Sequence, residues 1–152
     1  MIVPISRSDT EAWISLRKQL WPHCTEAEHR SEIRQLLSDP SRFAQFLYLD
    51  KSDISVGFAE VSIRSDYVNG AVTSPVAFLE GIFVEPHVRK TGIARRLVEE
   101  VSAWAKNQGL SELASDADLS NVTSHAVHEA LGFEERERVV FFRISLEESH
   151  GA

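Results

Sequence analysis

An apolar run that leads into a short basic turn and then into an amphipathic helix limits what this chain can fold into more than any other feature. Residues 76–84 (VAFLEGIFV) are almost continuously apolar, which predicts a strand buried on both faces, and Pro86 ends it. A helix is expected from about Gly92 to Gln108, because apolar side chains then recur at helical spacing and Gly109 follows as a C-terminal cap. A strand, a tight turn and a helix in this order are typical of an α/β domain.

The turn between that strand and that helix, residues 89–94 (RKTGIA), is the most informative segment for function. Successive backbone N–H groups there can form an anion-binding nest, and the N-terminus of the helix adds a positive dipole. Gly92 lets the backbone approach a ligand closely. A pyrophosphate would suit such a turn, although an ordinary strand-to-helix turn with a solvated basic face has the same spacing. Four basic side chains surround it on an otherwise acidic chain: Arg89, Lys90, Arg95 and Arg96.

The remaining segments complete an α/β domain with one mixed sheet. Helical spacing predicts helices that end at Trp21-Pro22, at Asp39-Pro40 and at Gly132. Strands are expected at residues 2–5, 43–50, 54–65 and 113–115, and in a last hairpin that Phe133 opens and residues 139–146 (VVFFRISL) close. The predicted order is therefore β-α-α-β-β-β-α-β-α-β-β. Along residues 54–65, alternation with apolar side chains predicts one solvated face, formed by Glu60, Ser62 and Arg64.

Composition and charge limit the class of partner. The 152 residues carry 16 Lys and Arg against 23 Asp and Glu, a net charge of 16 − 23 = −7. This balance argues against nucleic acid, because neutralising phosphates requires a surplus of Lys and Arg, but it allows a cationic partner or simple solubility. We expect a single domain, residues 1–146, and a polar tail, residues 147–152. No apolar run reaches the length of a membrane span and no signal-peptide pattern is visible, so we expect no membrane partner and a cytoplasmic location.

Neither a disulfide framework nor a metal site is expected. Cys24 is the only cysteine, and it has no CxxC partner. The six histidines form no HExxH pattern. His125 and His128 lie three residues apart on a predicted helix, which is weak support for a metal site.

Glu80 is the acidic residue that is hardest to explain by structure alone. It interrupts the apolar run, where an unpaired carboxylate would be costly, and Gly81 beside it predicts a bulge or a close backbone approach. Further acidic side chains gather between residues 112 and 137, where only Arg136 opposes them. Such a cluster is either an ordinary solvated face or a surface that attracts a polyamine-like sugar. Its members are Glu112, Asp116, Asp118, Glu129, Glu134, Glu135 and Glu137.

The basic turn and the element order together resemble the GNAT superfamily of acetyl-CoA-dependent N-acetyltransferases. The acyl-CoA signature of that superfamily reads Gln/Arg-x-x-Gly-x-Gly/Ala, and this chain has Arg89-x-x-Gly92-x-Ala94. The helix that ends at Leu131-Gly132-Phe133, with Asn121 upstream, is similar to the second CoA-facing motif of the superfamily. The resemblance implies the GNAT fold, an α/β mixed sheet flanked by helices, and acetyl-CoA as co-substrate.

A narrower resemblance covers most of the chain. Five stretches are similar to one subgroup of bacterial aminoglycoside 6′-N-acetyltransferases. They are RKQLWP (Arg17–Pro22), IRSDYVNG (Ile63–Gly70), SPVAFLEGIFV (Ser74–Val84), ASD (Ala114–Asp116) and HEALGFEERERVVFFR (His128–Arg143). Members of this type are often homodimers with the C-terminal strands near the interface, and the resemblance implies the same here.

The resemblance also implies roles for individual residues. The backbone of Ile82, Phe83 and Val84 would hold the pantetheine arm and the acetyl carbonyl, and Asn121 would contact the cofactor near its thiol end. The pyrophosphate would be cradled by Arg89, Lys90, Thr91, Gly92, Ile93, Ala94 and Arg95. The aminoglycoside site would be lined by Trp21, Tyr67, Glu80, Asp116 and Glu137.

Simpler explanations stay open for most of these side chains. Trp21 could cap a helix against the core instead of offering a flat wall to a sugar ring. Tyr67 could be ordinary loop surface, and Asp116 could start a turn or cap a helix.

The resulting hypothesis is an enzyme that transfers acetyl from acetyl-CoA to the 6′-amino group of aminoglycosides by direct attack in a ternary complex, which confers antibiotic resistance. Glu80 is the candidate for accepting the amine proton, with Asp116 as a second catalytic carboxylate, and strand N–H groups around Phe83 would serve the oxyanion. Many superfamily members have Tyr at the position of His128, so the acid that protonates the thiolate is left open between His128 and solvent. The alternatives are an acetyltransferase for another amine, such as a polyamine, peptide or lysine, and an acyl-CoA-binding module without catalysis.

Overall fold

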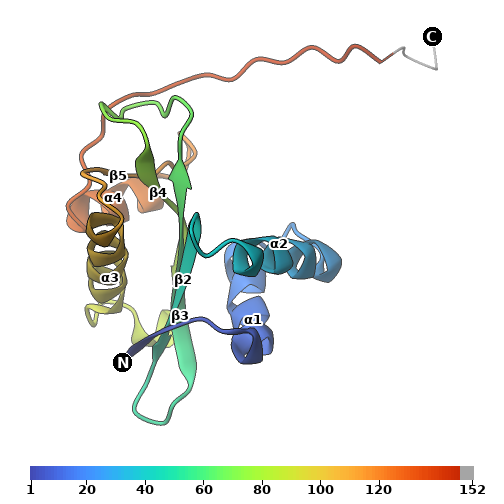
Figure 1. Ribbon diagram of the computed structural model, residues 1–152, viewed down its shortest axis with the longest axis vertical. Helices are drawn as coiled ribbons and strands as arrows, with labels where there is room; N and C mark the ends of the chain where they lie inside the picture. Colours follow the sequence, from blue (N-terminus) through green and yellow to red (C-terminus); the bar gives the residue numbers. More distant parts are fainter. Residues whose placement is uncertain (148–152) are drawn as a thin grey trace.

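A central sheet with helices on both faces forms the body of the protein (Figure 1). The computed structural model describes residues 1–147, so all but Glu147 of the polar tail predicted for residues 147–152 lies outside the described residues. Helices α1 (Thr10–Leu20) and α2 (Glu26–Ser38) cover one face, and α3 (Ile93–Asn107) and α4 (Val122–Ala130) cover the other. Two short 3₁₀ helices complete the fold of residues 1–147. The first, η1 (Arg7–Asp9), lies just before α1, and the second, η2 (Pro86–Val88), lies between the sheet and α3. The predicted α/β class is confirmed.

The sheet has five strands in the order in which they occur along the chain: β1 (Ile2–Pro4), β2 (Phe43–Leu49), β3 (Ser55–Arg64), β4 (Val76–Val84) and β5 (Leu113–Ala114). The first three pairings are antiparallel. The pairing of β4 with β5 is parallel and covers only two pairs, Ala77 with Leu113 and Phe78 with Ala114. Because β5 is so short, β4 and β5 separate after Phe78.

Helices α1, α2 and α3 place apolar side chains against the sheet. On α3 the inner stripe consists of Ile93, Leu97, Val101 and Ala105, which pack on the side of the sheet that carries Ala59 and Val61. Thr25 caps the N-terminus of α2, since its hydroxyl accepts a hydrogen bond from the N–H of Glu28 at 3.1 Å. Among residues 1–147, no helix combines the length and the apolar character that crossing a bilayer requires.

The face of β3 that the alternation predicts to be solvated is buried over most of its length. Glu60 is 4% exposed and Ser62 is 3% exposed, because α1 and the loops beside it cover that side of the strand. Only Arg64, at the end of β3, keeps a partly exposed side chain. The prediction was wrong for Glu60 and Ser62, because a strand pattern cannot tell solvent from a covering helix that supplies polar partners.

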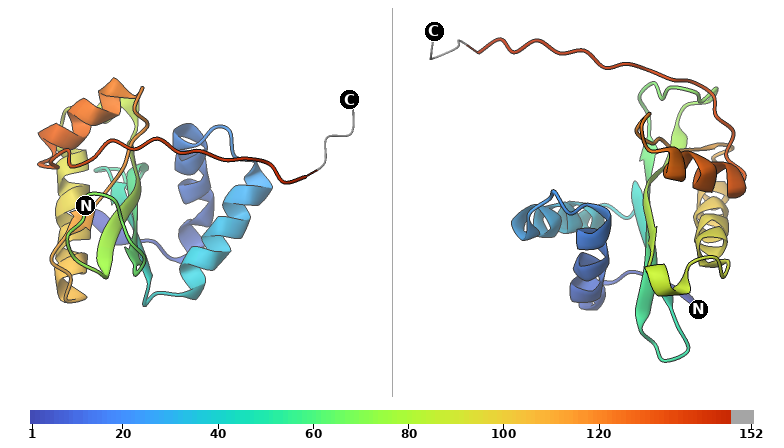
Figure 2. Two further views of the ribbon diagram at one scale, coloured as in Figure 1. Left: turned by 90° about the horizontal axis from the view of Figure 1, so that it is seen from above. Right: turned by 180° about the vertical axis from the view of Figure 1, so that it is seen from behind.

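The last two predicted strands are absent from the described part of the chain. Residues 133–147 form no strand, and Figure 2 shows the segment leaving α4 and projecting away from the body of the domain. Its apolar side chains are exposed: Phe141 by 86%, Phe142 by 92%, Ile144 by 83% and Leu146 by 92%. The order β-α-α-β-β-β-α-β-α therefore holds up to α4, and the predicted hairpin finds no strand partner among residues 1–147.

Candidate active site

β4 contains the bulge that the Glu80-Gly81 pair predicts. Gly81 pairs with Glu60 of β3 and Leu79 pairs with the next residue, Val61, so Glu80 is an extra residue without a partner of its own. A bulge bends the strand locally and re-aims the side chain of the extra residue. Solvent reaches the strand here, since Glu80 is exposed and Gly81 and Ile82 are half-buried. The expectation that this strand is buried on both faces is therefore wrong at the bulge.

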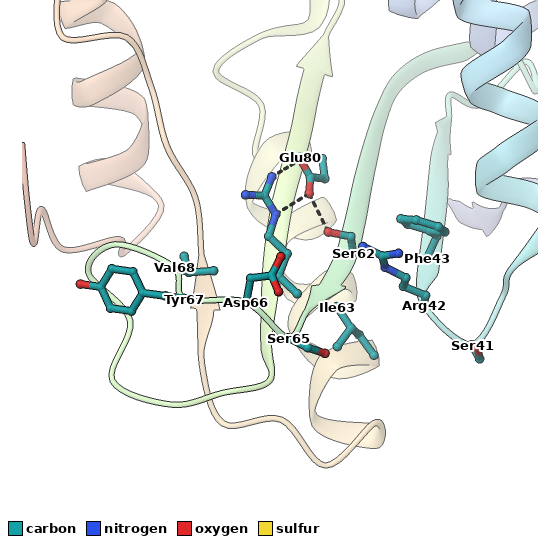
Figure 3. A pocket seen from close by; sticks show the side chains of 11 residues that line it. Ser41, Arg42, Phe43, Ser62, Ile63, Ser65, Asp66, Tyr67, Val68 and Glu80 are labelled. Carbon is teal, nitrogen blue, oxygen red and sulfur yellow. Dashed lines mark hydrogen bonds and ion pairs between the residues drawn. The ribbon is translucent and has the colours of Figure 1, made fainter. Parts of the chain in front are cut away.

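The Glu80 carboxylate is held by two side chains of β3. The Ser62 hydroxyl donates to Oε1 at 2.6 Å, and Arg64 donates from Nε at 3.0 Å and from Nη2 at 2.8 Å (Figure 3). The guanidinium also lies over the Phe78 ring, 3.5 Å from its centre. The bidentate pair with Arg64 fixes the orientation of the Glu80 carboxylate. Because 32% of the Glu80 side chain is exposed, the carboxylate remains accessible to a cationic ligand. Neither Ser62 nor Arg64 was predicted as a site residue, since only the β3–β4 register places them opposite Glu80.

A pocket of about 730 Å³ lies beside Glu80, between the end of β3, the start of β2 and the loop after β3. Tyr67 belongs to its lining, but its side chain is exposed (78% for the residue) and Figure 3 shows the ring pointing away from Glu80. The pocket thus brings Glu80 and Tyr67 to one cavity without bringing them into contact. The lining consists of Ser41, Arg42, Phe43, Ser62, Ile63, Arg64, Ser65, Asp66, Tyr67, Val68 and Glu80.

Trp21 reaches the other side of the bulge. A Cβ atom built at Gly81 would lie 2.5 Å and 2.6 Å from two carbons of the Trp21 indole, so the ring sits directly over the glycine. The close approach that Gly81 predicts is therefore made by an aromatic side chain from the end of α1. The fold thus brings Trp21 onto the residue that follows Glu80, although the two segments are far apart in the sequence.

Replacing Gly81 by alanine is expected to displace the indole. The new methyl group cannot share space with the ring, so we expect a loss of about 1–3 kcal/mol in the free energy of unfolding, measured by urea denaturation. In a Trp21→Ala background the same substitution should cost much less, because the obstructing ring is gone. Equal costs in both backgrounds would show that the contact with Trp21 is not what Gly81 serves.

The edge of β4 that faces β5 is open beyond the two shared pairs. Residues 81–84 pair with β3 on one side, and among residues 1–147 no strand pairs with them on the other. Ile82, Phe83 and Val84 lie on this stretch, with Phe83 and Val84 8% exposed. Unpaired backbone groups on such an edge are available to an extended ligand, which is how a strand-like arm can be held.

The backbone after η2 forms the predicted nest. Lys90 has φ 63° and Gly92 has φ 89°, both left-handed, and Gly92 caps the N-terminus of α3. Within residues 1–147, no backbone N–H of residues 90–95 donates to a backbone carbonyl, whereas Arg96 closes the first helical bond to Gly92. A row of free N–H groups at a helix N-terminus suits a pyrophosphate. Nothing lies within 4 Å of a Cβ built at Gly92, so the mouth of the nest is open.

Two of the arginines near the nest also brace the structure. Arg89 donates from Nε to the Val84 carbonyl at 2.8 Å, and Arg95 donates from Nη2 to the Ala130 carbonyl at 2.8 Å. Arg95 thereby ties α3 to the end of α4. Asn121 caps α4, since its Oδ1 accepts from the Ser124 N–H at 3.1 Å.

Two predicted acidic site residues lie elsewhere on the surface. Asp116 follows β5 and is exposed, and Glu137 lies on the projecting C-terminal segment. Neither lines the pocket beside Glu80. Glu112 has a structural role, because its carboxylate accepts from the N–H groups of Val72 and Thr73, at 3.0 Å and 2.6 Å, and from the Thr73 hydroxyl. It anchors the loop that carries Tyr67, and these hydrogen bonds lower the pKa of the Glu112 carboxyl.

His128 is held between two serines. Its Nδ1 lies 2.7 Å from the Ser124 carbonyl, so we assign the proton to Nδ1, and Nε2 then accepts from the Ser115 hydroxyl at 2.9 Å. Phe133 packs edge-on against the ring at 5.2 Å. Across the described residues no three His, Cys, Asp or Glu side chains gather as a metal site would require.

The five-stranded sheet with a bulged, open-edged β4 leading into an anion nest is the architecture of an acetyl-CoA-dependent acetyltransferase. The sequence model of the acetyltransferase (GNAT) family matches residues 9–133, and the chain belongs to that family. The resemblance to the GNAT superfamily is thereby confirmed.

Within the family, the chain is similar to aminoglycoside N(6′)-acetyltransferases of type 1 over nearly its whole length. It is 49% identical to the protein from Serratia marcescens, over 96% of this chain and 99% of the relative. It is 51% identical to the one from Acinetobacter baumannii, over 93% and 96%.

Solved structures give the same result. The aminoglycoside 6′-N-acetyltransferase AAC(6′)-Ih from A. baumannii superposes with a TM-score of 0.92 at 48% identity, covering 97% of this chain and 99% of that one. AAC(6′)-Iy in complex with the bisubstrate analog CoA-S-monomethyl-acetylneamine superposes with a TM-score of 0.90 at 43% identity, covering 95% and 97%.

Proposed function

We propose that the protein transfers the acetyl group of acetyl-CoA to the 6′-amino group of aminoglycosides. The observation that carries this proposal is its likeness, at 43% identity over 95% of the chain, to an acetyltransferase crystallised with an analog that joins CoA to acetylneamine. The local geometry supports it, because an exposed carboxylate and an aromatic ring flank the bulge from which the open edge of β4 runs toward an anion nest. Acetylation would remove one positive charge from the antibiotic and confer resistance.

Each part of the site has a distinct task in this reaction. The N–H groups of residues 90–95 bind the pyrophosphate, and the open edge at Ile82, Phe83 and Val84 holds the pantetheine arm. Strand N–H groups around Phe83 stabilise the oxyanion that forms when the amine nitrogen attacks the thioester carbon. Asn121, beyond its capping bond, lies at the start of α4 and contacts the thiol end of the cofactor.

Glu80 accepts the proton that the substrate ammonium must lose, directly or through a water molecule. The N–C bond then forms, the nitrogen gives its second proton to solvent as the C–S bond breaks, and the thiolate leaves and takes a proton from solvent or from His128. Holding both substrates in one geometry supplies much of the acceleration, so neither a covalent enzyme intermediate nor a metal is needed. Asp116 and Glu137 lie outside the pocket beside Glu80, and together with the ring of Tyr67 they extend the surface that a cationic sugar meets. Asp116 is the second candidate for a catalytic carboxylate.

The test is an acetyl-CoA-dependent thiol-release assay with two matched aminoglycosides, one with a 6′-amino group and one with a 6′-hydroxyl group. We expect turnover of the first and little or none of the second. Equal rates on both would contradict the regiochemistry. Turnover of polyamines or peptides alone would indicate an acetyltransferase for another amine, and CoA binding without any turnover would indicate a binding module.

We also propose that the protein is a homodimer in which the C-terminal segment of each copy packs on the other. Residues 139–146 expose two phenylalanines and four aliphatic side chains, and β5 is an edge strand with one side unpaired among residues 1–147. Four phenylalanines from two copies would each bury about 150–250 Å² of surface, which together is about half of the area that a standard protein–protein interface buries. We expect the dimer to act in the cytoplasm, where acetyl-CoA is available.

The dimer can be tested by light scattering coupled to gel filtration. Wild-type protein should have twice the mass of one chain, and the double variant Phe141→Asp/Phe142→Asp should have the mass of one. Ile54→Asp, at another exposed apolar position in the β2–β3 turn, is the control and should remain dimeric. A monomeric wild type would contradict the proposal, and a double variant that stays dimeric would show that the interface lies elsewhere.

A further inference from the structure

A fully buried charge lies beneath α1. Arg17 is 2% exposed, and its guanidinium donates to Glu60 Oε1 at 3.0 Å, to His29 Nδ1 at 3.2 Å and to the Glu32 carboxylate. Trp13 donates from Nε1 to the same Glu60 oxygen at 2.8 Å. Burial and the Arg17 charge lower the pKa of His29, so this ring is a neutral acceptor. The proposed chemistry uses none of these side chains.

The same guanidinium contacts the aromatic wall of the site. Trp13, Arg17 and Trp21 are spaced four residues apart, so they follow one line along α1 and its end. The Arg17 Cζ atom lies 4.7 Å from the centre of the Trp21 ring and 5.9 Å from that of Trp13. The Trp21 backbone N–H also donates to the Arg17 carbonyl at 2.8 Å. Arg17 therefore touches Trp21 through both its charge and its backbone.

The remaining supports of the indole among residues 1–147 are apolar and do not set its orientation by polar bonds. Trp21 packs at the edge of the buried cluster that contains Phe58 and Phe83, with the Phe58 ring edge-on at 6.1 Å between ring centres, and Gly81 lies under the ring without a side chain. Without the guanidinium, the indole would lose the charged group that lies over its face. A stacking wall for a sugar must be fixed before the sugar binds, because freezing it on binding costs affinity.

We propose that Arg17 is a positioning residue of the acceptor site, which fixes the Trp21 indole over Gly81 beside Glu80 so that the ring presents a rigid wall to the aminoglycoside. This proposal rests on the proposed function for the identity of the acceptor. Glu60, Glu32 and His29 hold the guanidinium in the core, where a cation–π contact is strongest because water is excluded.

Stability alone does not account for this cluster. Desolvation makes a buried ion pair a poor source of stability compared with apolar residues of the same volume. Burial raises the pKa of Glu60 to about 7, against the opposing effects of Arg17 and the Trp13 N–H. A flat, charged guanidinium offers the indole a stacked cation–π contact that no apolar side chain could reproduce.

Three variants separate positioning from folding. Arg17→Lys keeps the charge beside Glu60 but removes the flat group. Arg17→Met/Glu60→Gln removes both charges and keeps an amide oxygen for Trp13, which guards against unfolding by an unpaired buried carboxylate. The control is Arg30→Met, which breaks an exposed α1–α2 ion pair with Glu11 that does not reach Trp21.

We expect both Arg17 variants to raise the KM for a 6′-amino aminoglycoside by about 3- to 10-fold, with kcat and the KM for acetyl-CoA little changed. Arg30→Met should change none of these constants. In a Trp21→Ala background, Arg17→Lys should have no further effect on the aminoglycoside KM. An unchanged KM in both Arg17 variants, or an undiminished effect without Trp21, overturns the proposal.

A measurement without substrate keeps this inference separable from the proposed function. The ¹⁵N order parameter of the Trp21 indole N–H should fall in Arg17→Lys and stay at the wild-type value in Arg30→Met. An unchanged order parameter in Arg17→Lys overturns positioning by Arg17, whatever the enzyme acetylates. If the order parameter falls in Arg17→Lys but the wild-type protein acetylates no aminoglycoside, the proposed function is overturned. The inference that Arg17 fixes Trp21 would then still hold.

Discussion

Glu80→Gln is expected to lower kcat/KM for a 6′-amino aminoglycoside by about 10²–10³-fold, the range in which positioned general bases act. The amide keeps an oxygen for the Ser62 hydroxyl and for Arg64, so the bulge should remain folded. What it loses is the negative charge and the ability to accept the amine proton. Steady-state kinetics with acetyl-CoA in excess give the ratio directly.

The control for this prediction is Glu100→Gln on the exposed side of α3, which removes the same charge away from the bulge. It should leave kcat/KM within about twofold of wild type, because screened surface charges act weakly over distance. If Glu80→Gln retains near wild-type turnover while the thermal midpoint of both variants is normal, the proton acceptor lies elsewhere, with Asp116 the next candidate.

Gly92→Val is expected to weaken CoA binding by roughly ten- to a hundredfold. A valine at φ 89° is strained, and its methyl groups would stand at the open mouth of the nest, where a pyrophosphate needs to approach the N–H groups. Losing one charge-assisted hydrogen bond of about 1.5–3 kcal/mol accounts for a change of this size. Isothermal titration with CoA measures the dissociation constant.

Gly109→Val is a matched control, because Gly109 has φ 81° at the end of the same helix and its Cβ would also meet nothing within 4 Å. Both variants should lose about 1–2 kcal/mol of folding stability from the left-handed backbone. Only Gly92→Val should lose CoA affinity. Equal affinity in the two variants would mean that residues 89–95 do not hold the pyrophosphate.

The parts of the site that depend on local sequence could be predicted. The nest follows from a glycine and an alanine at fixed offsets after a strand, and the bulge follows from a carboxylate and a glycine inside an apolar run. Both are short-range effects of backbone freedom and side-chain polarity, so the sequence pattern was sufficient. The α/β class follows for the same reason, from periodicity within each segment.

The parts that depend on distant segments could not be predicted. Arg64 and Ser62 hold Glu80 only because β3 and β4 pair in one register, and Glu60 is buried only because α1 brings Arg17 and Trp13 to it. An alternating strand pattern looks the same beside water and beside a polar cluster. The acidic residues between positions 112 and 137 also differ in their roles. Glu112 anchors a loop through hydrogen bonds, which a count of charges along the sequence cannot reveal.

The C-terminal hairpin was predicted from a pattern that is genuine but incomplete. Residues 139–146 have the composition of a strand, yet a strand forms only with a partner, and none is present among residues 1–147. Sequence periodicity reports which segments can pair, not whether the partner lies in the same chain.

The most direct test of the central claim is a crystal structure of the protein with CoA and a 6′-amino aminoglycoside. The 6′-nitrogen should lie within hydrogen-bonding distance of the Glu80 carboxylate, with a sugar ring against Trp21 and the pyrophosphate on the N–H groups of residues 90–95. An aminoglycoside bound with its 6′-nitrogen away from the β4 bulge, or CoA bound outside the nest, would contradict the account.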